Sequence, residues 1–427
     1  FCIIFKVDKF VIEGGNRLNG KVRISGAKNS VLPIMAAAII SPSPKTIRNV
    51  PNLDDVITMV DLLEHLGITV KLDKGTKTLT IDPSEIKTHI APYEIVKKMR
   101  ASFYFLGALL ARAGRAKVSL PGGCAIGARP IDLHIKGIQG LGANIRIEHG
   151  YVIADGQHLK GSTIFLLGSK GTSVGATINV MMTAVLARGQ TIITPAACEP
   201  EVADVANFLN KLGATISGAG TPKIVIEGVK ELSGCDYEVI PDRIEAGTFA
   251  CAAAITGGDI KIEECRPDHL TATIEILKEM GIDITFEAEN LIVKAFDRPK
   301  STNITVAPFP GFPTDLQAQF MALLSLSKGQ GTITETIFEN RFIQAVELMR
   351  MGADIKLDGD TAIINGVPKL TGAKLMASDL RASASLVLAG LAAEGETEIS
   401  RIYHIDRGFE AFEKKLSTLG AKIRRVK

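Results

Sequence analysis

Hydrophobic and polar residues follow two periods along the chain, which predicts alternating helices and strands. Apolar residues every three to four positions are typical of helices, and apolar residues at every second position are typical of strands. One combination recurs: a helix-like stretch, then Leu or Met with Gly, then an alternating strand. It occurs as HLGITV, GLGANI, KLGATI, EMGIDI, RMGADI and TLGAKI. Glycine at this point predicts the end of a helix, because it adopts the left-handed backbone conformation without strain.

These phrases mark six copies of one repeat. Their glycines, spaced by 75, 71, 68, 71 and 68 residues, are Gly67, Gly142, Gly213, Gly281, Gly352 and Gly420. Two other phrases keep step with them: a helix of small residues before a Gly turn and a strand, as in AVLARGQTIIT, and a short strand ending in Gly, as in KIVIEG. A fixed period of this kind indicates repeated supersecondary units. Each copy reads strand, helix, strand, helix, strand, strand over about 70 residues.

The last copy stops at Lys427 without its closing strand, and residues 9–15 (KFVIEGG) supply a matching one. We therefore expect two domains of three repeats each. One is continuous, 28–239, and the other joins 1–27 to 240–427. The chain would cross between them near 26–28 and 239–242, and two crossing segments permit a hinge with a ligand cleft beside it.

Composition excludes several classes of protein. The chain is 46% hydrophobic and 22% charged, which is typical of a globular protein and excludes disorder, collagen and coiled coil for the whole. Lys and Arg number 49 against 46 Asp and Glu, a balance too even for a nucleic-acid-binding protein. No apolar run approaches the roughly 20 residues that span a bilayer. We expect no nucleic-acid partner and no membrane partner.

Cysteine and histidine usage favours a reduced compartment and no metal. The six cysteines form no C-x-x-C pair, and the seven histidines are scattered. Residues 1–5 are apolar but too few for the core of a signal peptide. We expect a cytoplasmic protein without a metal or organic cofactor, with Cys251 in a helix core.

Six equivalent positions, where a strand leads through a loop into an Ala-rich helix, carry polar or charged residues. Their sequences are SGAKNS, KMRAS, GTSVG, PDRIE, PTDLQ and SDLRAS. A helix N-terminus favours anions through its free N–H groups and positive potential. Capping by Asp and Ser is the alternative at any single position, but capping does not require cations. Four cations occur here: Lys28, Arg100, Arg243 and Arg381.

The loop PGGCAIGARPIDLH is the most unusual segment. It sets Cys124 among glycines, with Arg129 five residues later. A thiol in a Gly-rich loop near a cation is a candidate reactive group, and a structural cysteine is the alternative. Arg341 and Arg407 each follow a strand, where a solvated arginine is the ordinary interpretation.

The motifs SGAKNS, PGGCAIGARPIDLH, FPTDLQAQ, TETIFENRF, SDLRASASL and RIYHIDRGFE resemble those of the enolpyruvyl transferases that start peptidoglycan precursor synthesis. The resemblance runs from about Val7 to Lys427. It implies an α/β fold, a two-domain inside-out α/β barrel of six βαβαββ repeats, three per domain, with helices inside and sheets outside. The implied reaction transfers the enolpyruvyl group of phosphoenolpyruvate to the 3′-hydroxyl of UDP-N-acetylglucosamine and releases phosphate. The implied partners are these two small molecules.

The resemblance also implies roles for individual residues. Cys124 is the implied proton donor and Asp315 the implied base on the sugar hydroxyl. Phosphoenolpyruvate would be bound by Lys28, Asn29, Cys124, Arg129, Asp379, Arg381 and Arg407. UDP-N-acetylglucosamine would be bound by Arg100, Arg129, Pro130, Ile131, Asp132, Leu133, Ser173, Val174, Gly175, Asp315 and Ile337. One departure concerns Lys170: the family often has Lys directly before its VSVG turn, whereas here the order is KGTSVG.

Two alternatives stay open at this point. The enolpyruvyl transferase that acts on shikimate 3-phosphate has the same fold and co-substrate, but it does not use a PGGC loop of this form. A non-catalytic scaffold on the same fold would have lost the acid, the base and the cations together.

Overall fold

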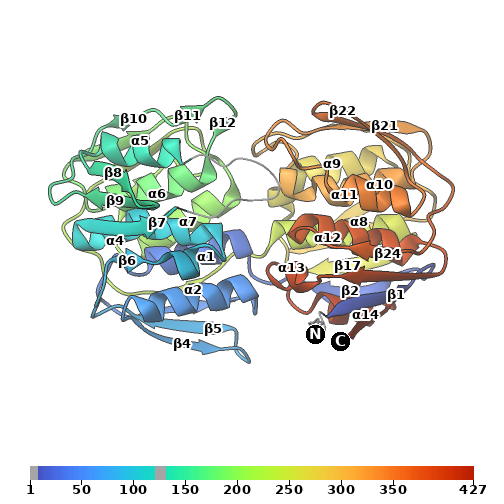
Figure 1. The fold of residues 1–427 in the computed structure, drawn as a ribbon, viewed down its shortest axis with the longest axis horizontal. Helices are drawn as coiled ribbons and strands as arrows, with labels where there is room; N and C mark the ends of the chain where they lie inside the picture. Colours follow the sequence, from blue (N-terminus) through green and yellow to red (C-terminus); the bar gives the residue numbers. More distant parts are fainter. Residues whose placement is uncertain (1–7, 121–130) are drawn as a thin grey trace. The chain divides into compact units, whose positions relative to one another are not determined.

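The computed structural model describes residues 8–120 and 131–427. They form two compact units (Figure 1). The terminal unit contains residues 8–25 and 241–427, and the central unit contains residues 26–120 and 131–240. The chain passes from one unit to the other between Ser25 and Gly26 and between Ile240 and Pro241. At these crossings Asp242 N–H donates to Ser25 O within the terminal unit, and Ala27 N–H donates to Ile240 O within the central unit.

Each unit contains three four-stranded sheets of one topology. In every sheet the two strands at one edge are parallel, and the remaining neighbours are antiparallel. In the central unit, the first sheet has the strand order β16 (Asp236–Glu238), β3 (Lys45–Arg48), β5 (Thr78–Asp82), β4 (Thr69–Asp73). The second has the order β6 (Ile90–Ala91), β7 (Arg115–Ser119), β9 (Tyr151–Asp155), β8 (Asn144–Glu148). The third has the order β10 (Thr163–Ile164), β13 (Gln190–Ile193), β15 (Ile224–Glu227), β14 (Thr215–Ser217). The central unit also has the hairpin β11 (Leu167–Gly168) and β12 (Gly171–Thr172).

The terminal unit repeats the arrangement. Its first sheet has the strand order β18 (Asp283–Glu287), β19 (Asn290–Lys294), β17 (Asp259–Glu263), β2 (Asn19–Arg23). The second has the order β20 (Asn303–Thr305), β21 (Gln330–Thr334), β23 (Thr361–Asn365), β22 (Asp354–Asp358). The third has the order β24 (Lys374–Met376), β25 (Glu396–Ser400), β1 (Lys9–Glu13), β26 (Lys422–Val426). The N-terminal strand β1 lies between β25 and β26, in the register Phe10↔Ile399 and Phe10↔Arg425. The N-terminal segment therefore completes the last repeat, as its sequence predicts.

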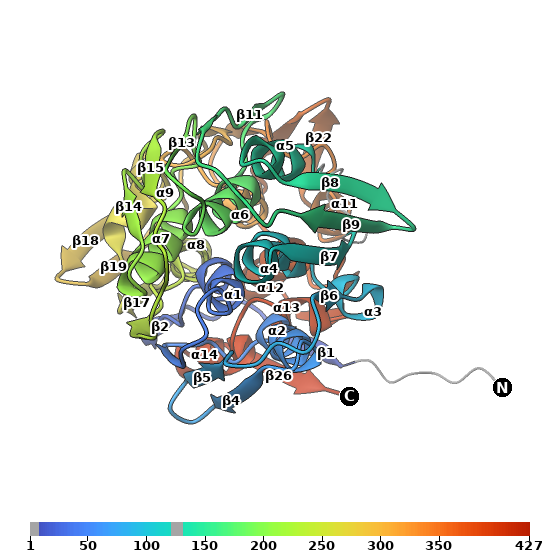
Figure 2. The same cartoon turned by 90° about the vertical axis from the view of Figure 1, so that its left-hand side faces the viewer.

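Three helices fill the middle of each unit. In the central unit they are α1 (Lys28–Ala37), α4 (Phe105–Ala113) and α6 (Val174–Ala184), which Figure 2 shows surrounded by the sheets. In the terminal unit they are α8 (Arg243–Thr256), α10 (Gln317–Ser325) and α12 (Leu380–Ala392). All residues of α10 are buried, and in α8 every residue from Ile244 to Ile255 is buried, including Cys251 as predicted. Helices with this many apolar and small residues on every side are stable only when they are buried all round.

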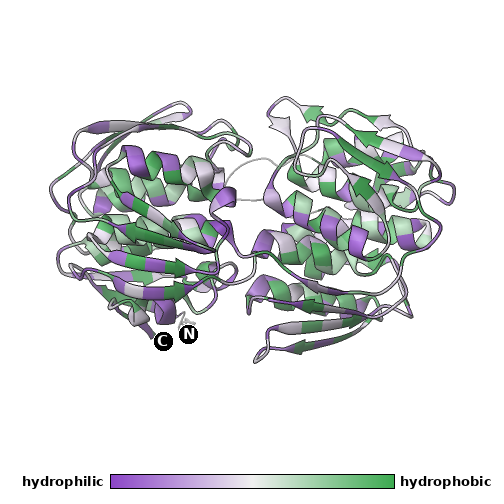
Figure 3. Cartoon of the chain, turned by 180° about the vertical axis from the view of Figure 1, so that it is seen from behind, coloured by the Kyte–Doolittle hydropathy of each residue, from purple (hydrophilic) through white to green (hydrophobic). Residues whose placement is uncertain are grey.

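The remaining helices connect or flank the sheets, and they bury one face only. The longer ones are α2 (Asp54–His65), α5 (Asp132–Gly140), α7 (Pro200–Lys211), α9 (Thr271–Glu279), α11 (Gln344–Arg350) and α14 (Phe412–Thr418). The short ones are α3 (Tyr93–Val96), α13 (Tyr403–Asp406) and the 3₁₀ helices η1 (Arg100–Tyr104), η2 (Pro267–Leu270) and η3 (Thr314–Leu316). Figure 3 shows hydrophobic and hydrophilic residues alternating along many of the strands. In β5 and β19, for example, every second residue is buried.

The six repeated glycines all adopt the conformation that their position predicts. Gly67, Gly142, Gly213, Gly281, Gly352 and Gly420 have φ between 88° and 105°. Each follows a helix within two residues and leads into a strand. A side chain at this φ is strained, so the glycine in each repeat is required by the backbone.

A buried polar cluster in the terminal unit fixes the segment just before the first crossing. Lys415 Nζ donates to Glu245 Oε1 at 2.6 Å and to Ser25 Oγ at 2.8 Å. Ser25 N–H donates to Glu245 Oε2 at 2.7 Å, and the Ser25 hydroxyl donates to Glu410 Oε2 at 2.7 Å. The cluster thus ties residue 25 to the start of α8 and to the segment before α14.

Removal of the lysine from this cluster should destabilise the protein. In Lys415→Met the carboxylate of Glu245, 2% exposed, would lose its cation. We expect the free energy of unfolding to fall by about 3–5 kcal/mol, the usual cost of leaving a buried charge unpaired. Urea denaturation measures it, with Lys414→Met at the exposed neighbour as control, where a change within about 0.5 kcal/mol is expected. Equal stability of the two variants would mean that the cluster contributes nothing.

Candidate active site

The six helix starts predicted from the sequence all begin helices. Lys28 is the first residue of α1, Arg100 opens η1 before α4, and Ser173 directly precedes α6. Asp242 and Asp379 directly precede α8 and α12, and Asp315 lies in η3, directly before α10.

Capping accounts for three of these positions. Ser173 Oγ accepts from Ala176 N–H at 3.2 Å. Asp242 Oδ1 accepts from the N–H groups of residues 244 and 245, and Asp379 Oδ1 accepts from Arg381 N–H at 2.9 Å and Ala382 N–H at 3.1 Å. In contrast, α1 begins at Lys28 without a side-chain cap, because Ala27 stands at its N-cap. Of these four helix starts, α1 is therefore the one without a side-chain cap.

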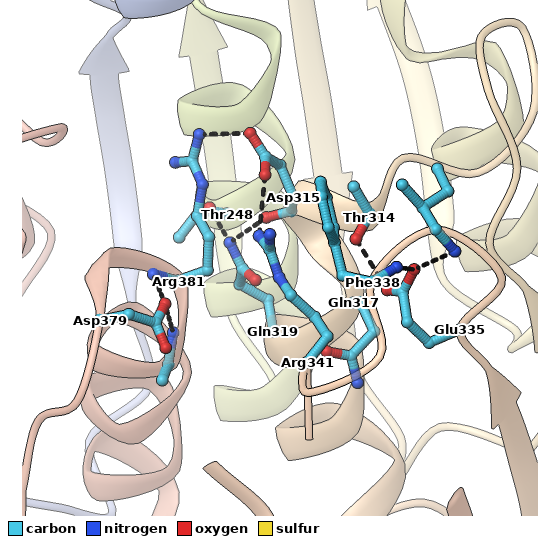
Figure 4. A network of polar contacts seen from close by, with 12 residues as sticks. Thr248, Thr314, Asp315, Gln317, Gln319, Glu335, Phe338, Arg341, Asp379 and Arg381 are labelled. Atoms are coloured by element: carbon cyan, nitrogen blue, oxygen red, sulfur yellow. Dashed lines mark hydrogen bonds and ion pairs between the residues drawn. The ribbon is translucent and has the colours of Figure 1, made fainter. Parts of the chain in front are cut away.

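The terminal unit holds a carboxylate between two arginines (Figure 4). Arg341 Nη2 lies 2.8 Å from Asp315 Oδ1, and Arg381 Nη2 lies 2.8 Å from Asp315 Oδ2. The side chains of Arg341 and Arg381 are only 4% and 6% exposed, and that of Asp315 is 26% exposed. Burial alone would raise the pKa of Asp315, but the charges and hydrogen bonds of Arg381 and Arg341 outweigh it, and this pKa lies well below its ordinary value.

Arg341 is not the solvated arginine that its local sequence suggests. It is buried, it is paired with Asp315, and its guanidinium lies 5.3 Å from the centre of the Phe338 ring. The partner is 26 residues away in the sequence, so nothing in the segment ENRF indicates it. Ile337, predicted for the nucleotide sugar, lies in the same segment and donates its N–H to Glu335 Oε1 at 2.9 Å.

Arg407 lies at the end of α13 in the terminal unit. It is near His404, whose pKa is lowered by burial and then by the charge of Arg407. Asp406, which directly precedes Arg407 in the sequence, forms an ion pair with Arg425 at 2.6 Å. The sequence neighbours Asp406 and Arg407 therefore have different surroundings.

In the central unit Lys28 is held by a buried carboxylate. Lys28 Nζ lies 2.8 Å from Asp55 Oδ2, and the two side chains are 12% and 4% exposed. Asp55 belongs to the first turn of α2. Asn29 follows Lys28 in the first turn of α1. The pairing fixes the position of the ammonium group of Lys28 at the start of α1.

His134 joins the predicted nucleotide-sugar segments of the central unit. The residues predicted for this substrate lie at η1 (Arg100), at the start of α5 (Ile131, Asp132, Leu133) and at the start of α6 (Ser173, Val174, Gly175). His134 of α5 packs edge-on against Phe103 of η1, with ring centres 5.1 Å apart. A Cβ added at Gly175 would lie 3.1 Å from its Nε2, so glycine leaves room for the imidazole at α6.

The imidazole of His134 is neutral. Its Nδ1 accepts from Asn179 Nδ2 at 2.8 Å, while the amide oxygen of Asn179 accepts from Gly107 N–H. Burial, and then the charge of Arg100, lowers the pKa of His134 to about 3. His134 was not predicted from the sequence because its contacts are with η1 and α6, which no local motif encodes. The phrase PIDLH was its only sequence signal.

Three predicted residues, Cys124, Arg129 and Pro130, lie outside the described residues. Lys170 lies between β11 and β12, next to the turn before Ser173. Within residues 8–120 and 131–427 no three His, Cys, Asp or Glu side chains gather as metal ligands. None of the helices in those ranges is both long and apolar enough to cross a membrane.

The fold and these helix starts define a class of protein. A family model described as EPSP synthase (3-phosphoshikimate 1-carboxyvinyltransferase) matches residues 12–416. The chain belongs to this family of enolpyruvyl transferases, and the predicted fold of six repeats in an inside-out α/β barrel is confirmed.

Individual relatives narrow the comparison. The chain is 55% identical over 417 residues to UDP-N-acetylglucosamine 1-carboxyvinyltransferase 1 of Caldanaerobacter subterraneus subsp. tengcongensis, covering 98% of this chain and 99% of the relative. It is 54% identical over 421 residues to UDP-N-acetylglucosamine 1-carboxyvinyltransferase of Trichlorobacter lovleyi, with the same coverage.

Crystal structures of relatives agree in fold. The enolpyruvyl transferase NikO from Streptomyces tendae matches with a TM-score of 0.89 at 28% identity, covering 98% of this chain and 99% of that one. EPSP synthase from Acinetobacter baumannii matches with a TM-score of 0.75 at 21% identity, covering 98% and 100%, which is a likeness of fold alone.

The Asp315 ion pairs should contribute stability down to acid pH. In Asp315→Asn two buried arginines lose their counter-charge, and we expect the free energy of unfolding to fall by about 3 kcal/mol. This is the low end of the usual range, because Asp315 is partly exposed. The native pKa of Asp315 lies below that of an unfolded aspartate, about 4, so this stability is fully present above about pH 5. It is lost only as the pH falls through the native value.

Denaturation of wild type and Asp315→Asn at several pH values checks this expectation. The difference between them should be constant from about pH 5 to pH 8 and should shrink only at lower pH. A difference that already disappears near neutral pH would contradict a carboxylate held ionised by Arg341 and Arg381.

Proposed function

We propose that this protein transfers the enolpyruvyl group of phosphoenolpyruvate to the 3′-hydroxyl of UDP-N-acetylglucosamine and releases phosphate. The observation that carries the proposal is identity of 54–55% over 98% of the chain to two proteins named for this reaction. The alternative acceptor, shikimate 3-phosphate, is not favoured, because the EPSP synthase compared above is only 21% identical. A non-catalytic scaffold is not favoured either, because Asp315 and the cations Lys28, Arg100 and Arg381 are all retained.

The cations proposed for phosphoenolpyruvate are Lys28, Arg129 and Arg407, with Asn29, Asp379 and Arg381 beside them. One feature of the α1 start supports a phosphate there. Lys28, the first residue of this helix, is held by Asp55, and a cation at a helix N-terminus adds to the positive potential of the helix end. These side chains supply the positive charge that phosphate and carboxylate need, so the proposal requires no metal or organic cofactor.

The proposed mechanism is addition followed by elimination. Cys124 gives a proton to the vinyl CH2 group of phosphoenolpyruvate, and C2 becomes electron-poor. The 3′-oxygen of the sugar bonds to C2 while its proton passes to Asp315, which gives a tetrahedral phosphoketal. Loss of a proton from the new methyl group and departure of phosphate then leave the enolpyruvyl ether.

The surroundings of Asp315 set a condition on this mechanism. A carboxylate whose pKa lies well below its ordinary value accepts a proton poorly. We infer that Asp315 acts as the base after the incoming sugar has replaced one of its two arginine contacts. Loss of either cation raises the pKa of the carboxyl group.

The nucleotide sugar is proposed to bind at Arg100, Arg129, residues 130–133, residues 173–175, Asp315 and Ile337. His134 supports the central-unit part of this set, because it contacts Phe103 and adjoins Gly175. We propose that the two units act as the two predicted domains, 28–239 and 1–27 with 240–427.

The proposal extends to the cellular role. The reaction would be the first committed step of peptidoglycan precursor synthesis in the cytoplasm, and so would serve cell-wall biogenesis, cell shape and division. Cys124 would also form a covalent adduct with phosphoenolpyruvate and would be the target of the epoxide antibiotic fosfomycin.

Phosphate release tests the proposed reaction. The purified protein should release phosphate from phosphoenolpyruvate when UDP-N-acetylglucosamine is added, and the product should gain an enolpyruvyl group by mass spectrometry. Shikimate 3-phosphate should give no release above the rate without acceptor. The reverse acceptor preference would overturn the proposal.

Fosfomycin should label Cys124 alone among the six cysteines. Alkylation requires a thiolate, and burial raises the pKa of each described cysteine, namely Cys198, Cys235, Cys251 and Cys265. For Cys265 the pKa is raised to about 11. Cys124→Ser should lose the label and most activity, because a hydroxyl is a poor acid at neutral pH. Peptide mass spectrometry that finds the label on Cys198 or Cys265 would show that Cys124 is not the reactive thiol.

A further inference from the structure

The segment between β21 and α11 in the terminal unit carries two groups of the candidate site, Ile337 and Arg341. It begins at Glu335, a residue to which the motifs assign no role. The Glu335 side chain is buried, with the residue only 4% exposed. A buried carboxylate is costly unless hydrogen bonds satisfy its oxygens, so the partners of Glu335 indicate what holds it there.

Both carboxylate oxygens of Glu335 accept hydrogen bonds, and they do so from two different elements (Figure 4). Oε2 accepts from Thr314 Oγ1 at 2.7 Å. Oε1 accepts from Ile337 N–H at 2.9 Å and from Phe338 N–H at 3.2 Å. The backbone of Glu335 is itself fixed, since its N–H donates to Asp360 O at 2.8 Å. Glu335 therefore joins η3 to the segment 336–341.

These contacts close a ring around the buried ion pair. Thr314 directly precedes Asp315, and Phe338 lies under the guanidinium of Arg341 at 5.3 Å from the ring centre. Arg341 returns to Asp315 at 2.8 Å. A displacement of Glu335 would thus move both partners of the ion pair and the backbone of Ile337 together.

We propose that Glu335 is a positioning residue for the acceptor substrate: through Thr314 and the N–H groups of Ile337 and Phe338 it sets Asp315 and Ile337 in register with the sugar hydroxyl. This inference rests on the proposed function. Misplacement of a reacting group by about 1 Å can cost on the order of a hundredfold in rate. Because Thr314 and residues 337–338 adjoin groups assigned to UDP-N-acetylglucosamine, loss of the Glu335 bridge acts on the binding of that substrate more than on the binding of phosphoenolpyruvate.

Paired substitutions at the two ends of the bridge test the proposal. Thr314→Val removes the hydroxyl with little change in shape, and Thr314→Ser keeps it. Glu335→Gln keeps the length of the side chain but replaces one acceptor oxygen with a donor. Thr305→Val, at an exposed position of β20, and Glu289→Gln, in the exposed turn after β18, are the matched controls. Steady-state phosphate release with each substrate varied gives kcat and both KM values, and thermal unfolding gives Tm.

We expect Thr314→Val and Glu335→Gln to lower kcat/KM for UDP-N-acetylglucosamine by about 10- to 100-fold, as expected for a lost hydrogen bond to a charged group. KM for phosphoenolpyruvate should stay within about twofold, as an unperturbed binding step requires. Thr314→Ser should restore most of the loss. The double variant should fall no further than the worse single one, because both changes break the same bridge.

Two results would overturn the role of Glu335. One is kinetic constants like those of the controls in both single variants, whatever their Tm. The other is a rise in KM for phosphoenolpyruvate as large as the rise in KM for UDP-N-acetylglucosamine, not restored by Thr314→Ser, which indicates a purely structural role. If Thr314→Val does not fold, Glu335→Gln decides alone. A wild-type protein that releases phosphate only with another acceptor would overturn the proposed function, a result distinct from either of these.

Discussion

The burial of three helices that are apolar on every side is the constraint on which the rest of each unit depends. A helix such as α10, whose residues are all buried, cannot lie at a surface, so the sheets must surround it. The sheets can do so because alternate residues of their strands are buried. Charged side chains are then confined to the first and last turns of these helices. Hence many of the candidate functional groups of this six-repeat chain lie at helix starts.

The helix starts share a position in the repeat but differ in electrostatics. At α6, α8 and α12 a Ser or Asp side chain accepts hydrogen bonds from backbone N–H groups of the first turn. At α1 these groups have no side-chain cap, and a lysine stands beside them. At α10 the acid is not a cap but the counter-ion of two arginines from other elements. One repeated backbone thus carries a lysine at one helix start, side-chain caps at three and an arginine-paired carboxylate at another, without any change of topology.

The features that could be predicted from the sequence are those that depend on residues close together in the chain. Glycine spacing gave the six repeats, since only the left-handed conformation after each helix requires Gly, and the unpaired last repeat gave the position of β1. All six helix starts were placed as well. Arg341, His134 and Glu335 were not predicted as site residues, because each is defined by a contact between distant parts of the chain. Arg341 meets Asp315 26 positions away, and His134 meets Asn179 45 positions away. Local motifs carry no information about such pairs.

The same distinction explains why fold alone does not identify the acceptor. EPSP synthase from Acinetobacter baumannii shares this architecture at 21% identity, so the repeats and their buried helices tolerate extensive substitution. The carboxylate of Asp315 is less free, since its partners come from other parts of the chain. Asp315 depends on Arg381 from α12, on Arg341 from the segment before α11, and, through Thr314, on Glu335. A change in any one of these groups would alter the surroundings of the others, so interlocked residues of this kind constrain the sequence more tightly than the fold that carries them.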